Sequence, residues 1–211
     1  MDWKNIPEID CGRVKLRVIA AGDESAIYDI YSDPKVIRYW GEAAMKSGDE
    51  KRFVRGAQED IRQRTCIQWG IIRKTDPGIV GIISLFAFDH VAKKAEIGFA
   101  LARAYWGNGF MREALYGAIS FAIREMNLRR IEADVDPRNT PAIKLLEALG
   151  FAQEGYLRER WLTPEETQDS LFYGLLSREW TADVDYRLTF PHDATIWRRL
   201  AQLASIVHLF E

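Results

Sequence analysis

The sequence predicts a mixed α+β fold, in which a central, mostly antiparallel sheet is flanked by helices. Three observations predict it. Segments rich in β-branched residues crowd into residues 66–101, short turns separate them, and later segments repeat their apolar residues at helical spacing. The chain has 211 residues, of which 47% are hydrophobic and 28% are charged, as is typical of a globular protein. We expect one domain over residues 1–180 and a C-terminal extension over residues 181–211.

The first third of the chain is predicted to hold one strand and two helices. Apolar and charged residues alternate over Val14–Val18, which is the period of a half-buried strand. A helix then begins near Asp23, and Pro34 ends it because the residue before a proline avoids the α region. A more polar helix is expected over residues 49–64.

The next segments predict an antiparallel meander. Strands are expected at Cys66–Arg73, at 79–88 and at Lys94–Leu101. Residues 75–78 predict the first turn, because Pro77 presets φ and Gly78 accepts a positive φ. The connections are too short for crossovers, so neighbouring strands must run in opposite directions.

The second half of the domain is predicted to alternate helices and strands. A turn with two glycines precedes a helix over residues 110–126. Pro141 suits the first turn of a further helix, which ends at Gly150. The remaining strands are expected at 131–135, 151–161 and 169–176, with a loop over 162–168 between the last two.

The C-terminal extension carries an apolar stripe at spacings of three and four residues, which predicts an amphipathic helix. The stripe consists of Ile196, Leu200, Leu203, Val207 and Phe210. Such a face has to be buried. It either packs on its own domain or forms a contact in a homodimer.

Composition narrows the function classes. A net charge of −2 gives no field that would attract nucleic acid, so we expect no such partner. Cys11 and Cys66 fit two thiols in a reducing compartment, and no residue spacing suggests a metal site. The first ten residues do not resemble a signal peptide, and no apolar run is long enough for a membrane span. We therefore expect a cytoplasmic protein.

The glycine turn before residue 110 is the most informative segment. A helix N-terminus presents unpaired N–H groups, and glycines let the backbone approach a ligand closely, which suits a diphosphate. Phe110 and Met111 follow Gly109 where a Walker A loop needs Lys and Ser or Thr, and Arg112 stands where a dinucleotide fingerprint needs glycine. A tight turn without any ligand is the plain alternative.

Five short stretches carry a family resemblance: EIGF at 96–99, YWGNGFMREA at 105–114, NTPA at 139–142, LGF at 149–151 and EG at 154–155. In this order and at this spacing they resemble the GNAT superfamily of N-acetyltransferases. The resemblance covers about residues 14–180 and is nearest to the ribosomal-protein alanine acetyltransferases and the spermidine acetyltransferases. It implies the GNAT fold, in which two neighbouring strands splay apart.

The resemblance also implies acetyl-CoA as co-substrate. The glycine turn would hold the CoA diphosphate through its main-chain amides, and the pantetheine arm would lie along the strand at Phe99, Ala100 and Leu101. The implied diphosphate loop consists of Trp106, Gly107, Asn108, Gly109, Phe110, Met111 and Arg112. Two of these, Trp106 and Met111, depart from the superfamily pattern. Asn139 would face the cofactor arm, cap the next helix, or do both.

The reaction implied is acetyl transfer to a primary amine, either a protein N-terminus or a small molecule. Glu96 is the candidate catalytic base, because a carboxylate there could take the amine proton. The alternative is a surface carboxylate that pairs with Lys93 or Lys94. Leu146 stands where many superfamily members have an acidic tyrosine, so water, a serine or Tyr173 would have to protonate the thiolate.

Two further questions stay open at the level of sequence. A non-catalytic CoA-binding sensor or interaction module of the same fold is the alternative to an enzyme. Trp40, Trp106 and Trp161 could line an acceptor groove or belong to the core.

Overall fold

The computed structural model describes residues 2–41, 43–163 and 166–180. The predicted amphipathic helix of the C-terminal extension lies outside these residues. The strands are β1 (Ile9–Asp10), β2 (Val14–Val18), β3 (Cys66–Arg73), β4 (Asp76–Asp89), β5 (Lys94–Leu101), β6 (Arg130–Val135), β7 (Ala152–Leu162) and β8 (Thr167–Leu176). The helices are α1 (Glu24–Tyr31), α2 (Asp49–Gln63), α3 (Phe110–Arg124) and α4 (Thr140–Ala148), with a 3-10 turn at Arg103–Tyr105.

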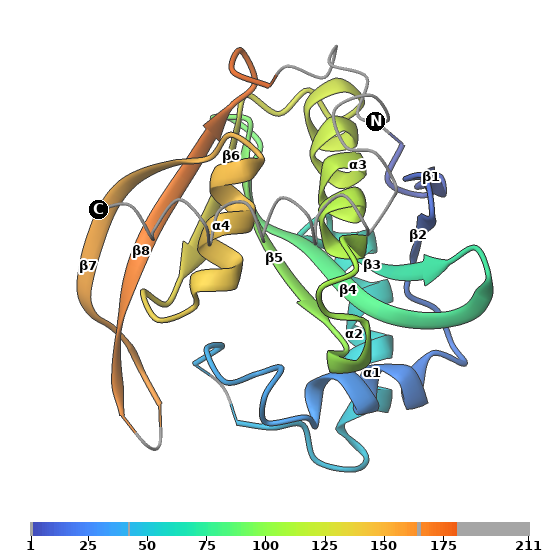
Figure 1. Cartoon of the computed structure of the whole chain (residues 1–211). Coiled ribbons are helices and arrows are strands. Elements are labelled where there is room, and N and C mark those ends of the chain that lie inside the picture. Colours follow the sequence, from blue (N-terminus) through green and yellow to red (C-terminus); the bar gives the residue numbers. More distant parts are fainter. Residues whose placement is uncertain (1, 42, 164–165, 181–211) are drawn as a thin grey trace, which may run out of the picture. The chain divides into compact units, whose positions relative to one another are not determined.

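All eight strands form one sheet in the order β1-β2-β3-β4-β5-β6-β8-β7 (Figure 1). Every neighbouring pair is antiparallel except β5 and β6, which run parallel. A parallel pair needs a crossover, and α3 supplies it. The predicted α+β class and the antiparallel meander are confirmed.

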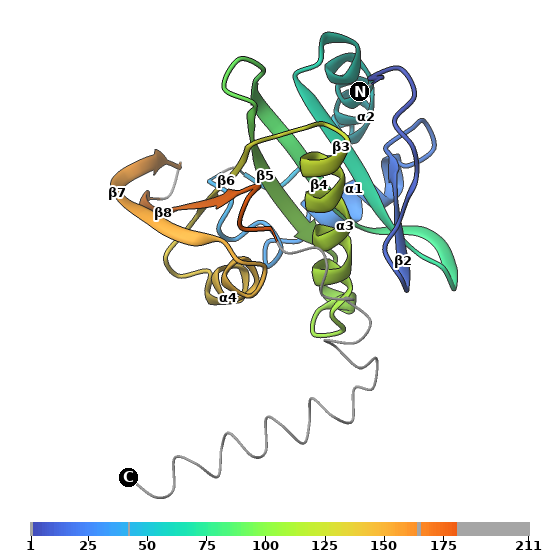
Figure 2. The ribbon, with the colours of Figure 1, turned by 90° about the horizontal axis from the view of Figure 1, so that it is seen from above.

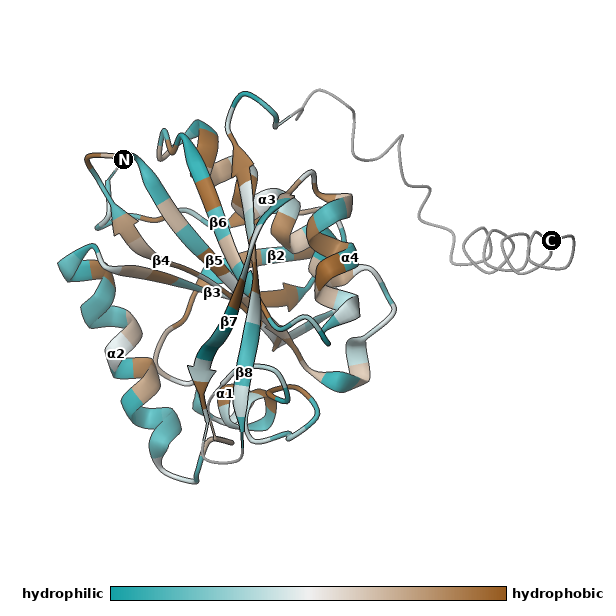
Figure 3. Ribbon diagram, turned by 90° about the vertical axis from the view of Figure 1, so that its left-hand side faces the viewer, coloured by the Kyte–Doolittle hydropathy of each residue, from teal (hydrophilic) through white to brown (hydrophobic). Residues whose placement is uncertain are grey.

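The helices cover both faces of the sheet (Figure 2). On one face α3 and α4 bury Leu115, Ile119 and Leu146 against the strands in the larger core cluster. On the other face α1 and α2 pack in a smaller cluster that includes Ile27 and Val54. Figure 3 shows α2 as mostly hydrophilic along its length, in agreement with only Val54 and Ala57 being buried on it.

The parallel junction between β5 and β6 is short. Only three residue pairs join them, from Lys94 opposite Arg130 to Glu96 opposite Glu132. Beyond these pairs the strands diverge, as can be followed in Figure 1. The remainder of β5 therefore pairs with β4 alone, over Ile97 to Leu101. The splayed strand pair is confirmed.

One predicted turn is wrong in position. The turn expected at residues 75–78 lies at Lys74 and Thr75, and β4 already begins at Asp76, which pairs with Arg73. The register shifts next to Ile72, so that Pro77 and Gly78 are accommodated as an irregularity inside the strand. Proline and glycine interrupt regular strand pairing, and in this protein the interruption is a bulge inside β4. The turn itself lies earlier in the chain.

The other boundaries differ from the prediction by one or two residues. The described domain ends where Trp180 packs on α3, because its indole Nε1 donates to Ser120 Oγ at 3.3 Å and its ring lies 5.0 Å from that of Tyr116. Among the helices that the structure describes, none is both long and apolar enough to cross a bilayer.

Candidate active site

The glycine turn links the end of β5 to the start of α3. Gly107 and Gly109 have φ values of +74° and +77°, and α3 begins at the next residue, Phe110. Both values lie in the left-handed region, where a side chain would be strained. Glycine at these two positions is therefore required by the backbone path.

The turn leaves a row of main-chain donors available. Among the described residues, none accepts a hydrogen bond from the N–H groups of residues 107–111. The hydrogen bonds of the helix start only at Glu113, whose N–H donates to Gly109 O at 3.2 Å. A helix N-terminus with unpaired N–H groups favours an anion. The turn therefore meets the chemical requirement of a diphosphate site.

The side chains of the turn brace it from within the protein. The Trp106 indole donates to Leu101 O at 2.7 Å, and Asn108 Nδ2 donates to Trp106 O at 3.0 Å. Met111 is buried in the larger core cluster, so its bulk belongs to the core. Arg112 is half-buried, and burial lowers the pKa of its guanidinium. The two departures from the superfamily pattern thus have local structural explanations.

Beyond Glu96, no strand of the described residues lies beside one edge of β5. Phe99 and Leu101 pack against the core cluster beneath α3, whereas Ala100 belongs to the cluster on the opposite face. An extended ligand chain could add to such an edge through main-chain hydrogen bonds. Because Leu101 O already accepts from Trp106, we expect the contacts to come mainly from the other backbone groups of this segment.

Glu96 lies where the two strands begin to separate. Its neighbour in the register is Glu132, so the two side chains share a face of the sheet. Burial raises the pKa of Glu96, and the negative charges of Asp134 and Glu132 raise it further, against the opposing charges of Arg160 and Lys94. A carboxyl group with a raised pKa beside a strand opening is suited to proton transfer.

Glu132 has the opposite electrostatic setting. Burial pushes its pKa upward, but hydrogen bonds from Arg130 Nε at 2.7 Å and Lys94 Nζ at 2.9 Å outweigh burial, so the pKa lies below its usual value. Lys94 thus pairs with Glu132, and no ion pair is found for Glu96 among the residues that the structure describes. The environment separates the two carboxyl groups and favours Glu96 as the base.

The sequence profile of the family described as Acetyltransferase (GNAT) domain matches residues 13–152, which is more than half of the chain. The chain belongs to the GNAT acetyltransferase family. This match spans the glycine turn, the splayed strands and Glu96, so the features described above lie inside the GNAT domain.

Individual proteins give the same result. N-acetyltransferase p20 of Bacillus licheniformis, itself uncharacterised, is 32% identical over 169 residues, covering 80% of this chain and 95% of that protein. The ribosomal protein uS5-alanine N-acetyltransferase of Escherichia coli is 27% identical over 124 residues, covering 57% of this chain and 62% of that protein. The crystal structure of spermidine N-acetyltransferase from Vibrio cholerae, in complex with CoA and spermine, superposes with a TM-score of 0.72 at 23% identity, covering 79% and 97% of the two chains. This last likeness shows the GNAT fold.

The asparagine in the turn before α4 caps that helix. Asn139 Oδ1 accepts from Ala142 N at 3.3 Å, which is the bond of an N-cap residue. No described residue accepts a hydrogen bond from its Nδ2 group. The capping alternative is therefore observed, and the amide hydrogens remain available for the predicted contact with the cofactor arm.

One of the three candidate tryptophans lies on the side of the base. Trp161 Nε1 donates to Asp134 Oδ1 at 3.3 Å, and its side chain lies beside Gly41. Sequence reasoning missed Asp134, which also accepts from Ser170 Oγ and lies 3.5 Å from Arg160 Nε. Side chains alternate between the two faces along β6, so Asp134 lies on the same face as Glu132. This alternation in the sequence could have predicted that Asp134 lies near the candidate base. Trp40 instead packs against Tyr31 at 5.2 Å.

Tyr173, the residue named for the general acid, lies on the other face of the sheet from Glu96. Leu146, at the position of the superfamily tyrosine, is 1% exposed in the core. Tyr173 pairs with Ala133 and so faces the opposite side of the sheet from Glu132 and Glu96. Its hydroxyl donates to Glu147 Oε1 at 3.2 Å, and burial, together with the Glu147 charge, raises its pKa. A GNAT enzyme with this arrangement has to protonate the leaving thiolate from another source.

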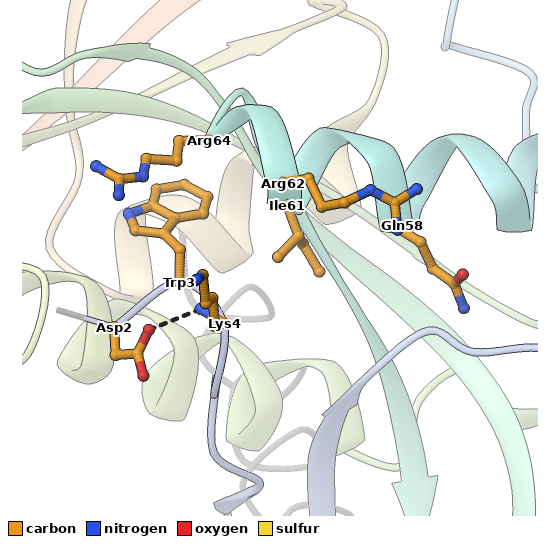
Figure 4. A pocket seen from close by; sticks show the side chains of 7 residues that line it. All are labelled: Asp2, Trp3, Lys4, Gln58, Ile61, Arg62 and Arg64. Carbon is orange, nitrogen blue, oxygen red and sulfur yellow. Dashed lines mark hydrogen bonds between the residues drawn. The ribbon is translucent and has the colours of Figure 1, made fainter.

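A hollow of about 550 Å³ lies elsewhere on the described surface. It is lined by Asp2, Trp3, Lys4, Gln58, Ile61, Arg62 and Arg64 (Figure 4). Trp3 packs on Phe88 near the end of β4, whereas the glycine turn follows the other end of β5. This hollow is therefore separate from the candidate active site. No group of three or more His, Cys, Asp or Glu residues in the described part of the chain could hold a metal ion.

Proposed function

We propose that this GNAT protein transfers the acetyl group of acetyl-CoA to a primary amine by direct attack on the thioester. One observation carries the proposal. The free main-chain donors of residues 107–111 stand at the end of a strand whose edge is open from Ile97 onward. A diphosphate on the donors and an extended arm along the edge together match the shape and chemistry of CoA.

Each part of the predicted site has a role in this proposal. The amides of residues 107–111 bind the diphosphate, whereas the N–H of Trp106, at the start of the predicted loop, already donates to Arg103 O at 3.2 Å. Phe99, Ala100 and Leu101 align the pantetheine arm. Asn139 donates from Nδ2 to an amide carbonyl of the arm. When bound, the co-substrate supplies an activated acetyl group, while the protein orients it and excludes water.

Glu96 prepares the acceptor. An ammonium group has no lone pair, so the Glu96 carboxylate removes its proton, directly or through one water molecule. The amine nitrogen then forms a bond to the acetyl carbon as the bond from that carbon to sulfur breaks. The attacking nitrogen loses its second proton to solvent, which gives the neutral amide, and the departing thiolate takes a proton from solvent, which is feasible for a thiol with a pKa near ~8.5.

The acceptor is proposed to be a small cationic amine or a protein N-terminus. The polar face beside Glu96 contains Glu132 and Asp134, but Arg130 and Lys94 pair with Glu132 and Arg160 lies beside Asp134, so the acceptor class rests on the relatives. The Escherichia coli relative is named for a ribosomal protein, and the Vibrio cholerae structure contains spermine. We also propose a cytoplasmic location, because the reaction consumes acetyl-CoA. The apolar stripe predicted in residues 181–211 is the reason to propose a homodimer contact there, with packing on its own domain as the alternative.

An acceptor panel tests the proposal. Purified protein is incubated with acetyl-CoA and, in turn, spermidine, spermine and peptides that begin with alanine, and the released thiol is measured. We expect saturable thiol release with at least one amine and a product heavier by one acetyl group. Binding of acetyl-CoA without turnover on any amine would favour a CoA-binding sensor instead.

A further inference from the structure

Arg13, just before β2, contacts Asn108 of the diphosphate loop, 95 positions further along the chain. Its Nη2 group donates to Asn108 O at 2.8 Å, and its Nε group donates to Glu113 Oε1 at 2.5 Å. The main-chain N–H of Arg13 donates to the other carboxylate oxygen of Glu113 at 2.9 Å. Arg13 thus bridges the loop and the first turn of α3.

Both ends of this bridge are held in place. Glu113 is only 2% exposed, so its carboxylate depends on Arg13 for charge compensation. Arg13 O accepts from Lys74 N at 3.1 Å, which ties it to the turn after β3, and its guanidinium lies 4.8 Å from the centre of the Phe110 ring. A planar guanidinium with several donors in a fixed fork can hold this geometry, whereas an ammonium cannot.

The contact with Asn108 O sets the direction of a neighbouring donor. The carbonyl of Asn108 and the N–H of Gly109 belong to one peptide group, which is planar and trans, so they point in opposite directions. Holding the carbonyl on Arg13 therefore aims the Gly109 N–H away from Arg13. Gly109 has a φ of +77° and could otherwise sample several conformations.

We propose that Arg13 is a positioning residue, which orients the Gly109 amide for the CoA diphosphate by holding Asn108 O. The inference rests on the proposed function, because it assumes that this loop binds the diphosphate. Its positive charge is compensated by Glu113, so Arg13 acts through geometry. The consequence is specific: its loss weakens only ligands that carry a diphosphate.

Titrations with two ligands test this inference. The variant Arg13→Lys keeps the charge beside Glu113 but cannot hold Glu113 and Asn108 O together. CoA and pantetheine, which lacks the diphosphate, are titrated into wild type and variant while amide NMR signals are followed. We expect the dissociation constant for CoA to rise about tenfold, the usual weight of a hydrogen bond to a charged group, and that for pantetheine to stay within twofold.

Arg17→Lys is the matched control. Arg17 lies on β2, four positions after Arg13, and donates to Asp23 through Nη1 and Nη2 at 2.7 Å each, but this pair is attached to the start of α1. The same substitution there costs stability without touching the loop, so we expect unchanged affinity for both ligands. If Arg13→Lys does not fold, the double change Arg13→Gln with Glu113→Gln removes the buried charge and is measured in its place.

The outcomes separate the two proposals. Wild-type protein that fails to bind CoA would overturn the proposed function and the role of Arg13 with it. Wild-type binding with no loss in the Arg13 variant would overturn the positioning role alone. An equal loss for pantetheine, or an equal loss in the Arg17 control, would also overturn it, because either result would indicate a general effect on the fold.

Discussion

At the scale of single residues, environment divides two neighbouring glutamates into different roles. Glu96 and Glu132 lie opposite each other in one register, yet the pKa of Glu96 is raised and that of Glu132 is lowered. The difference arises because Arg130 and Lys94 bind Glu132, whereas burial and two nearby carboxylates act on Glu96. Residue type alone cannot distinguish a base from an ion-pair partner.

The first prediction concerns the reaction rate. Replacing Glu96 by Gln keeps the shape but removes the base, so kcat is expected to fall by about 10²-fold or more. In the wild type the rate rises with pH as Glu96 loses its proton, above the usual range of a glutamate because its pKa is raised. Pre-steady-state pH profiles should show this rise in the wild type and its absence in the variant. A variant that retains the same profile would exclude Glu96 as the base.

The second prediction concerns stability. A carboxyl group with a raised pKa in the folded state stabilises the protein below its unfolded pKa, and this contribution is lost as pH rises through the folded pKa. Glu96→Gln avoids that loss, so its melting temperature should exceed that of the wild type increasingly as pH rises from 4 to 8. Glu132→Gln is the control with the opposite sign, because its lowered pKa stabilises the protein above the unfolded value. Thermal melts of both variants at several pH values test this. Melting temperatures that change with pH in the same direction in both variants would contradict the prediction.

At the scale of elements, the loop between β5 and α3 combines two glycines with a row of unpaired donors. The β5 strand delivers the chain to the turn, and the 3-10 turn at Arg103–Tyr105 redirects it before α3 begins. The geometry of the loop is therefore set by the elements on both sides, with the Trp106 indole on Leu101 O as an internal brace.

The third prediction tests the loop. Gly109→Ala places a side chain at a φ of +77° and only 3.3 Å from Arg13 Nη2. The strain of about 1–2 kcal/mol should raise the KM for acetyl-CoA roughly fivefold or more, with little change in the KM for the amine. Gly22→Ala carries similar strain at a φ of +100°, with open space around it and far from the loop in sequence. Equal changes in the KM for acetyl-CoA in both variants would contradict a specific role for the loop.

The elements show what could be predicted from sequence and what could not. The meander and the helix at Phe110 were predictable because their signals are local: alternation, apolar spacing and turn residues. The shift of the first turn to Lys74 was not, since it depends on a bulge in the register of β3 and β4. The pairing of Arg13 with Glu113 joins segments far apart in the sequence, so no local sequence pattern predicts it. The expected contacts of the site with CoA remain predictions.

At the scale of the whole molecule, the sheet consists of two antiparallel groups joined at one short parallel junction. The first group consists of β1 to β5, and α1, α2 and most of α3 pack against it. The second group consists of β6, β8 and β7. The candidate site lies where these groups separate, so neither group contains it alone.

The fourth prediction concerns the limits of the domain. A chain that ends at Trp180 keeps the contacts of Trp180 with Ser120 and Tyr116, so it should melt within a few degrees of the full chain and bind CoA equally well. Sedimentation of both forms tests the proposed homodimer, which should be present only in the full chain. The same oligomeric state in both would remove residues 181–211 from the dimer contact.

The divergence of β5 from β6 also creates two unpaired strand borders in the interior of the sheet. Unpaired strand edges promote aggregation, because their backbone groups can form hydrogen bonds with the extended backbone of another chain. A ligand arm that fills the opening would cover the unpaired backbone groups of both strands. Protein purified without CoA should therefore aggregate more on storage than protein kept with CoA. Light scattering of the two preparations measures the difference.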